Sequence, residues 1–221
     1  MRTAIFDLDG TLADTSGDLI ASANSCFRGL GYGNVLDPIK DARTAFQGGR
    51  AMLNLGFERV KPGFSAQDVD GQYPLLLEAY AGEIDVFTKL YPGAIEAIEG
   101  LKSKGYALGI CTNKPAGLAE ILLKRLGIRG LFASMIGADT LPVRKPDPAP
   151  FFAAVEGAGG SAARAFLLGD TITDRKTAAA AGVPCALVTF GPDGRQVADL
   201  NPEALLDHFS DLEALAERLT Q

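Results

Sequence analysis

The chain has 221 residues, of which 47% are hydrophobic and 22% charged, enough for one domain with a large insertion or for two modest domains. Its formal net charge is −6 and it has no clustered basic run, which argues against a nucleic-acid partner. No apolar run approaches the roughly 18 residues that span a bilayer. The first residues, Met1 to Asp7, lack an apolar signal core, so we expect neither a membrane association nor export.

Cysteine and histidine are both scarce. The three cysteines, Cys26, Cys111 and Cys185, are far apart and odd in number, which indicates reduced thiols and a cytoplasmic location. His208 is the single histidine, so histidine-based catalysis or zinc binding would depend on this one residue. We therefore expect carboxylates, lysine and hydroxyl groups to carry any chemistry.

Five short apolar runs predict buried strands, and helical patterns lie between the later ones. The predicted strands cover residues 3–6, 107–111, 134–137, 165–168 and 185–188, and the intervening helices cover 116–126, 148–157 and 174–181. Strands that alternate with helices predict an α/β fold with a parallel sheet covered on both faces. Ligands of such open sheets bind outside the carboxyl ends of the strands.

The first two predicted strands are about 100 residues apart, far more than a single crossover helix requires. A predicted helix at 93–104 fills the end of this gap, and residues 18–30, 40–46, 51–60 and 66–81 also have helical patterns. We predict a helical cap domain at residues 16–86, inserted into a catalytic core formed by residues 1–15 and 87–221.

Reactive or phosphate-binding residue types follow the predicted strands. Asp7, Asp9 and Gly10 follow the first strand, and Thr112 and Asn113 follow the second. Farther along the chain, Lys145 lies past the third strand, and Asp170 and Asp174 follow the fourth. Each of these has an ordinary explanation when taken alone, such as a turn, a helix cap or a surface lysine. Their coincidence at strand ends favours a shared site.

These residue types suit phosphoryl transfer. Clustered carboxylates from Asp7, Asp170 and Asp174 offer the hard oxygen ligands that Mg²⁺ prefers. Asp7 can form an acyl phosphate, and Asp9 can exchange a proton with the leaving group and with water. Thr112 and Lys145 supply a hydroxyl and a cation to the phosphoryl oxygens.

The run Asp7-Leu8-Asp9-Gly10-Thr11-Leu12 resembles the nucleophile motif of the haloacid dehalogenase superfamily, and Thr112, Lys145 and Gly169-Asp170…Asp174 resemble its other three motifs in order. The resemblance implies a doubly wound, Rossmann-like sheet of order 3-2-1-4-5 with an inserted four-helix cap. It also implies roles for these residues.

By this resemblance, Asp7 is the nucleophile and a metal ligand, and Asp9 is the general acid and base and binds Mg²⁺ through its backbone carbonyl. Thr112 and Lys145 bind phosphate, where we also place Asn113 and Gly10. Asp170 binds the metal directly, and Asp174 binds it directly or through water.

Within the superfamily, three stretches resemble phosphoglycolate phosphatases: 90–93, 108–115 and 145–150, together with 207–212 near the end of the chain. The expected partner is thus a small phosphorylated metabolite such as 2-phosphoglycolate, handled by a monomer or homodimer. A second carboxylate on the substrate needs a donor from the cap, and Gly49-Arg50 is our candidate, with Arg43 second.

Three other functions remain open on the sequence. A phosphosugar mutase on the same scaffold would return the phosphoryl group to a sugar. Carbon–halogen cleavage needs no magnesium, so the full set of metal aspartates argues against it. A non-catalytic phosphometabolite-binding domain should have lost Asp7 or a metal aspartate, and this chain keeps them all.

Overall fold

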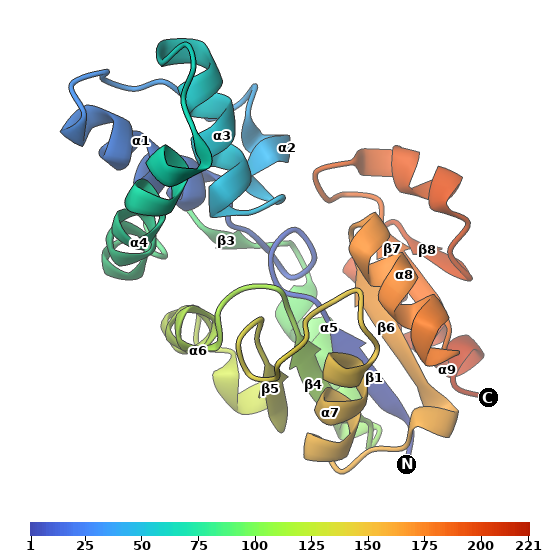
Figure 1. The fold of residues 1–221 in the computed structure, drawn as a ribbon. Coiled ribbons are helices and arrows are strands. Elements are labelled where there is room, and N and C mark those ends of the chain that lie inside the picture. Colours follow the sequence, from blue (N-terminus) through green and yellow to red (C-terminus); the bar gives the residue numbers. More distant parts are fainter. The chain divides into compact units, whose positions relative to one another are not determined.

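The computed structural model describes all residues, 1–221. The chain forms two compact units. One comprises Met1–Ala13 and Leu90–Gln221, and the other comprises Asp14–Lys89 (Figure 1). The chain crosses between them at two short strands, β2 (Ala13–Asp14) and β3 (Lys89–Leu90), which pair with each other.

The larger unit is built on a six-stranded parallel sheet in the order β5-β4-β1-β6-β7-β8. Its strands are β1 (Thr3–Phe6), β4 (Ala107–Cys111), β5 (Ser134–Ile136), β6 (Ala165–Gly169), β7 (Cys185–Val188) and β8 (Ala204–Leu206). For the five strands expected from the sequence, this is the order 3-2-1-4-5, so the predicted topology is confirmed. The edge strand β8 was not predicted from the sequence.

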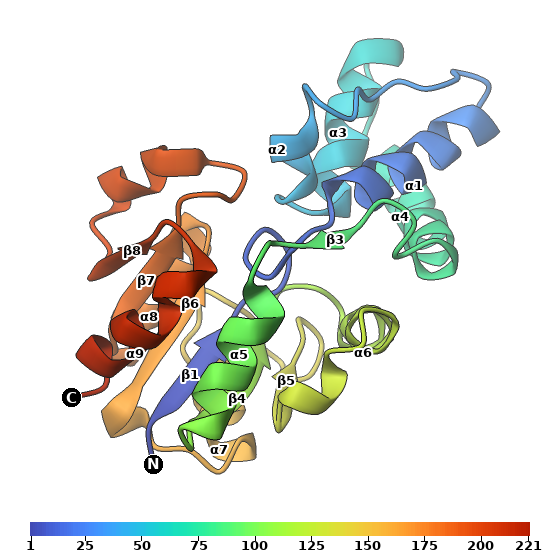
Figure 2. The same ribbon diagram turned by 180° about the vertical axis from the view of Figure 1, so that it is seen from behind.

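The sheet is apolar because helices cover both of its faces. Helices α7 (Ala149–Gly157) and α8 (Ile172–Ala181) pack on one face, and α5 (Ala94–Ser103) and α9 (Leu212–Leu219) pack on the other (Figures 1 and 2). Helix α6 (Ala116–Arg125) lies beside the edge strand β5. Ile5, Phe151 and Leu167 belong to a core cluster that is fully buried between sheet and helices.

Short 3₁₀ helices complete this unit. They are η1 (Arg129–Leu131), η2 (Ala162–Arg164), η3 (Gly194–Leu200) and η4 (Phe209–Asp211). With the exception of η3, each is a single turn of three residues that connects a helix and a strand.

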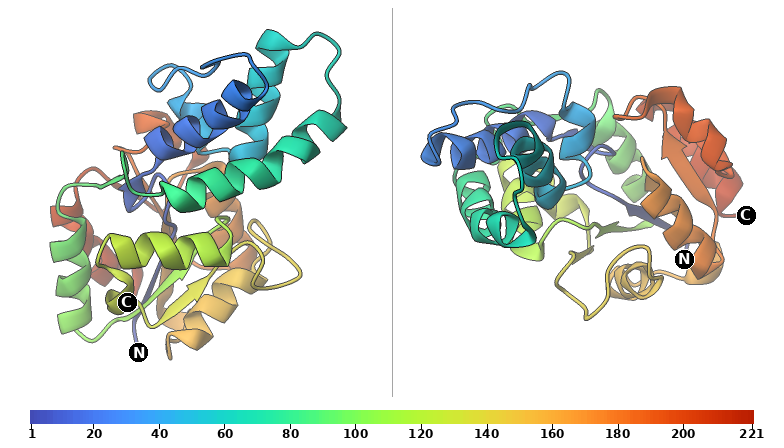
Figure 3. Two further views of the ribbon diagram at one scale, coloured as in Figure 1. Left: turned by 90° about the vertical axis from the view of Figure 1, so that its left-hand side faces the viewer. Right: turned by 45° about the horizontal axis from the view of Figure 1, so that its top comes forward.

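The smaller unit is helical. It contains α1 (Ser16–Gly29), α2 (Ala42–Ala45), α3 (Gly49–Val60) and α4 (Ala66–Gly82), seen as the blue-to-green helices of Figure 3. The edge of the Phe27 ring on α1 packs against Phe57 of α3, with ring centroids 5.2 Å apart. Asp18, buried in α1, accepts hydrogen bonds from the backbone amides of Phe87 and Thr88 and so ties the returning chain to this helix.

None of the helices combines the length and the apolar character that crossing a bilayer requires.

Candidate active site

The register of the sheet brings the residues of the sequence motifs together at the carboxyl ends of the strands. Phe6, the last residue of β1, pairs with Ile110 of β4 on one side and with Leu168 of β6 on the other. The chains that leave these three strands therefore emerge side by side at their carboxyl ends, where parallel sheets bind ligands. The backbone of Asp7 is held against β6, because its amide donates to the Leu168 carbonyl at 2.9 Å.

A tight turn follows Asp7. Gly10 has a φ of +80°, a conformation that side chains disfavour, and its amide donates to the Ala13 carbonyl at 2.9 Å. Asp9 forms an isolated bridge with Ala13 on the same turn. Gly10 was expected near the phosphate; since its own amide is already bonded, its contribution is to the shape of the turn that carries Asp7 and Asp9.

The loop after β4 carries the predicted hydroxyl. Thr112 is buried, and its Oγ1 accepts the Lys114 amide at 3.2 Å, which leaves the hydroxyl hydrogen for donation. Asn113, on the same loop, donates one hydrogen bond from Nδ2 to the Lys145 carbonyl at 3.1 Å. Asn113 thus ties this loop to the loop that carries Lys145.

Lys145 is a buried cation between two carboxylates. Lys145 is 3% exposed, and its Nζ lies 2.6 Å from Asp174 Oδ1 and 3.1 Å from Asp7 Oδ1. Burial by itself would lower the pKa of this ammonium, but the charges of Asp174 and Asp7 outweigh it and raise the pKa above its ordinary value. Lys145 is therefore a permanent positive charge.

The loop after β6 holds the remaining two aspartates. Asp174 lies in the first turn of α8 and completes a capping box, in which its Oδ2 accepts the Thr171 amide at 3.1 Å and the Thr171 hydroxyl at 2.8 Å. Gly169 is required here, because a Cβ on it would lie 2.3 Å from the Asp174 carboxyl carbon. Asp170 accepts the Thr11 hydroxyl on Oδ1 at 3.0 Å.

Asp7, Asp170 and Asp174 form a buried carboxylate cluster, with one oxygen of each lying within 4.8 Å of the others. Burial raises the pKa of Asp7 to about 6, against the opposing effect of Lys145. Burial, with the neighbouring charges of Asp174 and Asp7, also raises the pKa of Asp170 well above its usual value. Three carboxylates thus share one ammonium, and the site has an excess of negative charge.

The donor set of this cluster fits a divalent cation. Asp170 Oδ2 is buried and accepts no hydrogen bond, and Asp7 Oδ1 has no hydrogen-bond partner although Lys145 is close by. Buried carboxylate oxygens without partners are costly unless a cation or donor meets them. Oxygen ligands and uncompensated negative charge are what magnesium-type ions require.

The cap candidates Gly49, Arg50 and Arg43 lie in the helical unit. Gly49 is the first residue of α3, directly after Gly48, and Arg50 follows it. The Arg50 guanidinium pairs with Asp70 at 2.5 Å and lies 4.6 Å from the centroid of the Tyr73 ring, while its side chain is 54% exposed. Arg43 lies in the short helix α2.

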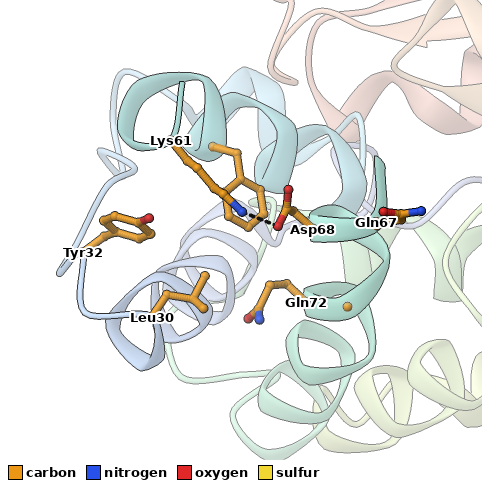
Figure 4. Close-up of a pocket in the computed structure, with 8 residues that line it drawn as sticks. Leu30, Tyr32, Lys61, Gln67, Asp68 and Gln72 are labelled. Carbon is orange, nitrogen blue, oxygen red and sulfur yellow. Dashed lines mark hydrogen bonds and ion pairs between the residues drawn. The ribbon is translucent and has the colours of Figure 1, made fainter. Parts of the chain in front are cut away.

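The helical unit also has a hollow of its own. Its volume is about 240 Å³, and its lining residues come from the end of α1, from α3 and from α4. Figure 4 shows how these side chains lie around it. Lys61 and Asp68 form an ion pair at its wall, near Tyr32 and Gln72. None of the residues predicted from the motifs lines this hollow.

Two contacts of the site were not predicted from the sequence. Lys114 is 6% exposed, and its Nζ donates to Asp9 Oδ1 at 2.7 Å. Thr11 donates to Asp170 across the gap between two loops. Thr11 and Lys114 both lie inside sequence motifs, which is the one feature of the sequence that indicated a role for them. Their contact partners follow only from the fold.

The fold and this arrangement define a class of protein, and comparison with known proteins agrees. Residues 4–188 match the family of haloacid dehalogenase-like hydrolases, and the chain belongs to this family. The relatives that it matches over nearly its whole length identify it as a phosphatase of the haloacid dehalogenase type.

Two of these relatives are phosphoglycolate phosphatases. The protein from Mesorhizobium japonicum is 38% identical over 97% of this chain and 95% of its own, and that from Agrobacterium fabrum is 37% identical over 98% and 93%. Among solved structures, that of a predicted phosphoglycolate phosphatase from Haemophilus somnus has a TM-score of 0.85 at 25% identity and covers 97% of both chains.

Proposed function

We propose that this phosphatase hydrolyses a small phosphomonoester through a phosphoryl group carried on Asp7, with magnesium as its cofactor. The observation that carries the proposal is the buried cluster of Asp7, Asp170 and Asp174 around Lys145 at the carboxyl ends of the strands. A dianionic substrate needs its charge neutralised and its nucleophile held in line, and this cluster supplies both kinds of group.

The proposed reaction has two steps. A carboxylate oxygen of Asp7 attacks the phosphorus, the bond from phosphorus to the leaving-group oxygen breaks, and Asp9 gives that oxygen a proton. Asp9 then takes a proton from the water that attacks the phosphorus of the acyl phosphate. The bond from phosphorus to Asp7 breaks, and inorganic phosphate and the original Asp7 carboxylate result.

Thr112 and Lys145 are the proposed phosphate-binding residues. Thr112 has a hydroxyl hydrogen to donate, and the neighbouring carboxylates raise the pKa of Lys145 and so favour its charged form. Donors fixed before the substrate arrives need no reorganisation during the reaction, which makes them effective in stabilising developing charge. Asn113 and Gly10 would act by holding the loops in place.

Asp7, Asp170 and the backbone carbonyl of Asp9 would bind the magnesium ion directly, and Asp174 would bind it through a water molecule. Both oxygens of Asp174 already carry hydrogen bonds, from Lys145 and from Thr171, which favours contact through water. When bound, the ion would neutralise charge on the carboxylates and the phosphoryl group, so that one anion can approach another.

For the substrate, we propose 2-phosphoglycolate, on which the similar proteins from Mesorhizobium and Agrobacterium act by name. The helical unit, residues 14–89, would act as a cap that excludes water during the reaction. Arg50 is the proposed contact for the substrate carboxylate. Its pairing with Asp70 and Tyr73 restrains the guanidinium while leaving about half of the side chain exposed.

A panel of phosphorylated metabolites tests this function. We expect kcat/KM with magnesium to be highest for 2-phosphoglycolate, followed by other small phosphorylated acids, with phosphosugars far behind. Turnover that appears only when a sugar bisphosphate primes the enzyme would instead identify a phosphosugar mutase. Equal rates across the whole panel would count against a dedicated carboxylate contact.

A further inference from the structure

Lys114 is a second buried lysine in the site, separate from Lys145. Its side chain is 3% exposed, and its Nζ donates to Asp9 Oδ1 at 2.7 Å. Lysine is almost never this buried unless a negative partner compensates for the lost hydration. The two lysines contact different aspartates of the site: Lys145 contacts Asp7 and Asp174, and Lys114 contacts Asp9.

The backbone of Lys114 is held at both of its polar groups. Its amide donates to the Thr112 hydroxyl oxygen at 3.2 Å, and its carbonyl accepts the Ala138 amide at 3.0 Å. Pro115, which follows, has a restricted φ and precedes the first residue of α6. The ammonium is therefore presented from a rigid loop, at the end of a strand that pairs directly with β1.

The backbone of Asp9 is held in its turn by the bridge to Ala13. The torsion that orients its carboxyl group has a broad and roughly two-fold energy profile, so contacts of that group set its orientation. The hydrogen bond from the Lys114 ammonium to Oδ1 is one such contact, and it directs this oxygen towards the loop after β4. The position of Oδ2 follows from the same rotation.

From these contacts we infer that Lys114 is a positioning residue, which orients the Asp9 carboxyl for proton exchange with the leaving group. The inference rests on the function proposed above, in which Asp9 gives a proton to the departing oxygen. General acid catalysis contributes about 10²–10⁴-fold and requires hydrogen-bond geometry, so a misoriented Asp9 would lose a large part of that factor.

A leaving-group series separates this role from a merely structural one. Alkyl phosphates have basic leaving groups that need a proton, whereas 4-nitrophenyl phosphate has a good leaving group that needs it far less. We expect Lys114→Met to lower kcat/KM at least about tenfold more for alkyl phosphates than for 4-nitrophenyl phosphate, since kcat/KM covers the steps up to P–O cleavage. A plot of log kcat/KM against leaving-group pKa would become steeper.

Three further variants act as controls. Asp9→Asn should steepen the same plot, and adding Lys114→Met to it should change the slope little further, because residues that act as a unit are not additive. Lys114→Gln keeps one donor and should give an intermediate slope; it also serves if the methionine variant does not fold, which thermal unfolding will reveal. Lys124→Met removes an exposed lysine of α6, 66% exposed and paired with Glu120, and should leave the slope unchanged.

The outcomes are distinguishable. Equal losses for all leaving groups, in a folded variant, would overturn the inference and leave a structural role. A loss confined to the KM of carboxylate-bearing substrates would show that Lys114 contacts the substrate and would also overturn it. Wild-type protein that hydrolyses no phosphomonoester would overturn the proposed function itself, and the inference with it.

Discussion

Asp170 has an oxygen that the protein leaves without a partner, and replacing it should stabilise the metal-free protein. Oδ1 of Asp170 accepts the Thr11 hydroxyl, but Oδ2 is buried, accepts no hydrogen bond and lies among the other carboxylates. Asp170→Asn keeps the acceptor for Thr11 and puts an amide donor where Oδ2 was. The change replaces a carboxyl group whose charged form burial and the neighbouring carboxylates disfavour, and it supplies a donor to the neighbouring acceptors.

The expected gain follows from the cost of a buried polar atom without a partner, about 1–3 kcal/mol. For a chain of this size, 1 kcal/mol shifts Tm by about 2–4 °C, so Asp170→Asn should raise Tm by about 2–12 °C in excess chelator. Magnesium should reverse the ranking. At a concentration 1,000 times its Kd it stabilises the wild type by about 4.1 kcal/mol, which exceeds the whole gain of the variant, and it should stabilise the variant much less.

Thermal unfolding of both proteins, in chelator and across a magnesium titration, measures these effects. Asp199→Asn is the matched control, since it makes the same chemical change at an exposed aspartate and should shift Tm little. A variant that is less stable than the wild type in chelator would refute the reasoning about Oδ2. A variant that magnesium stabilises as much as the wild type would remove Asp170 from the metal site.

Further predictions concern activity, specificity and pH. Chelation of magnesium should abolish hydrolysis and re-addition should restore it, and full activity in excess chelator would exclude the metal assignment. Arg50→Ala should raise KM for 2-phosphoglycolate more than for an uncharged aryl phosphate; equal increases would argue against a carboxylate contact. Asp41 accepts two hydrogen bonds of 2.7 Å from Arg59, which hold its pKa below the usual value. Asp41→Asn should therefore cost about 1–3 kcal/mol of stability at neutral pH. That advantage of the wild type is complete above the unfolded pKa of about 3.9 and is lost as pH falls through the lower folded value. Unfolding curves that keep the same difference between the two proteins at pH 2 would contradict this linkage.

Five strands of the parallel sheet could be predicted from the sequence because they are buried on both faces, whereas their order followed from the family resemblance. Ala165 to Gly169, for example, is an uninterrupted buried run, and such runs stand out in a sequence. β8 could not be predicted in the same way. It has three residues, Ala204–Leu206, and so short a segment shows no periodicity; its place in the sheet comes from its pairing with β7.

The proximity of Asp7 and Asp170 could also be predicted, because each follows a strand and the carboxyl ends of parallel strands lie on the same side of the sheet. The pairing of Lys114 with Asp9 did not. Lysine side chains have four rotatable bonds, and the sequence does not indicate whether the ammonium reaches solvent, phosphate or a carboxylate. Arg50 poses the same difficulty, since its contacts with Asp70 and Tyr73 depend on how α3 and α4 pack.

The central claim is that the phosphoryl group passes through Asp7, and chemical trapping tests it most directly. Acid quenching during turnover, borohydride reduction and peptide mapping should convert Asp7 of the wild type to homoserine, because hydride reduces an acyl phosphate. With 4-nitrophenyl phosphate, whose leaving group has little need of a proton, Asp9→Asn should accumulate more of this product, because the base for the second step is missing. Asp7→Asn should fold normally, hydrolyse nothing and give no label. An active wild-type enzyme without reduction at Asp7, or with reduction at another aspartate, would contradict the account.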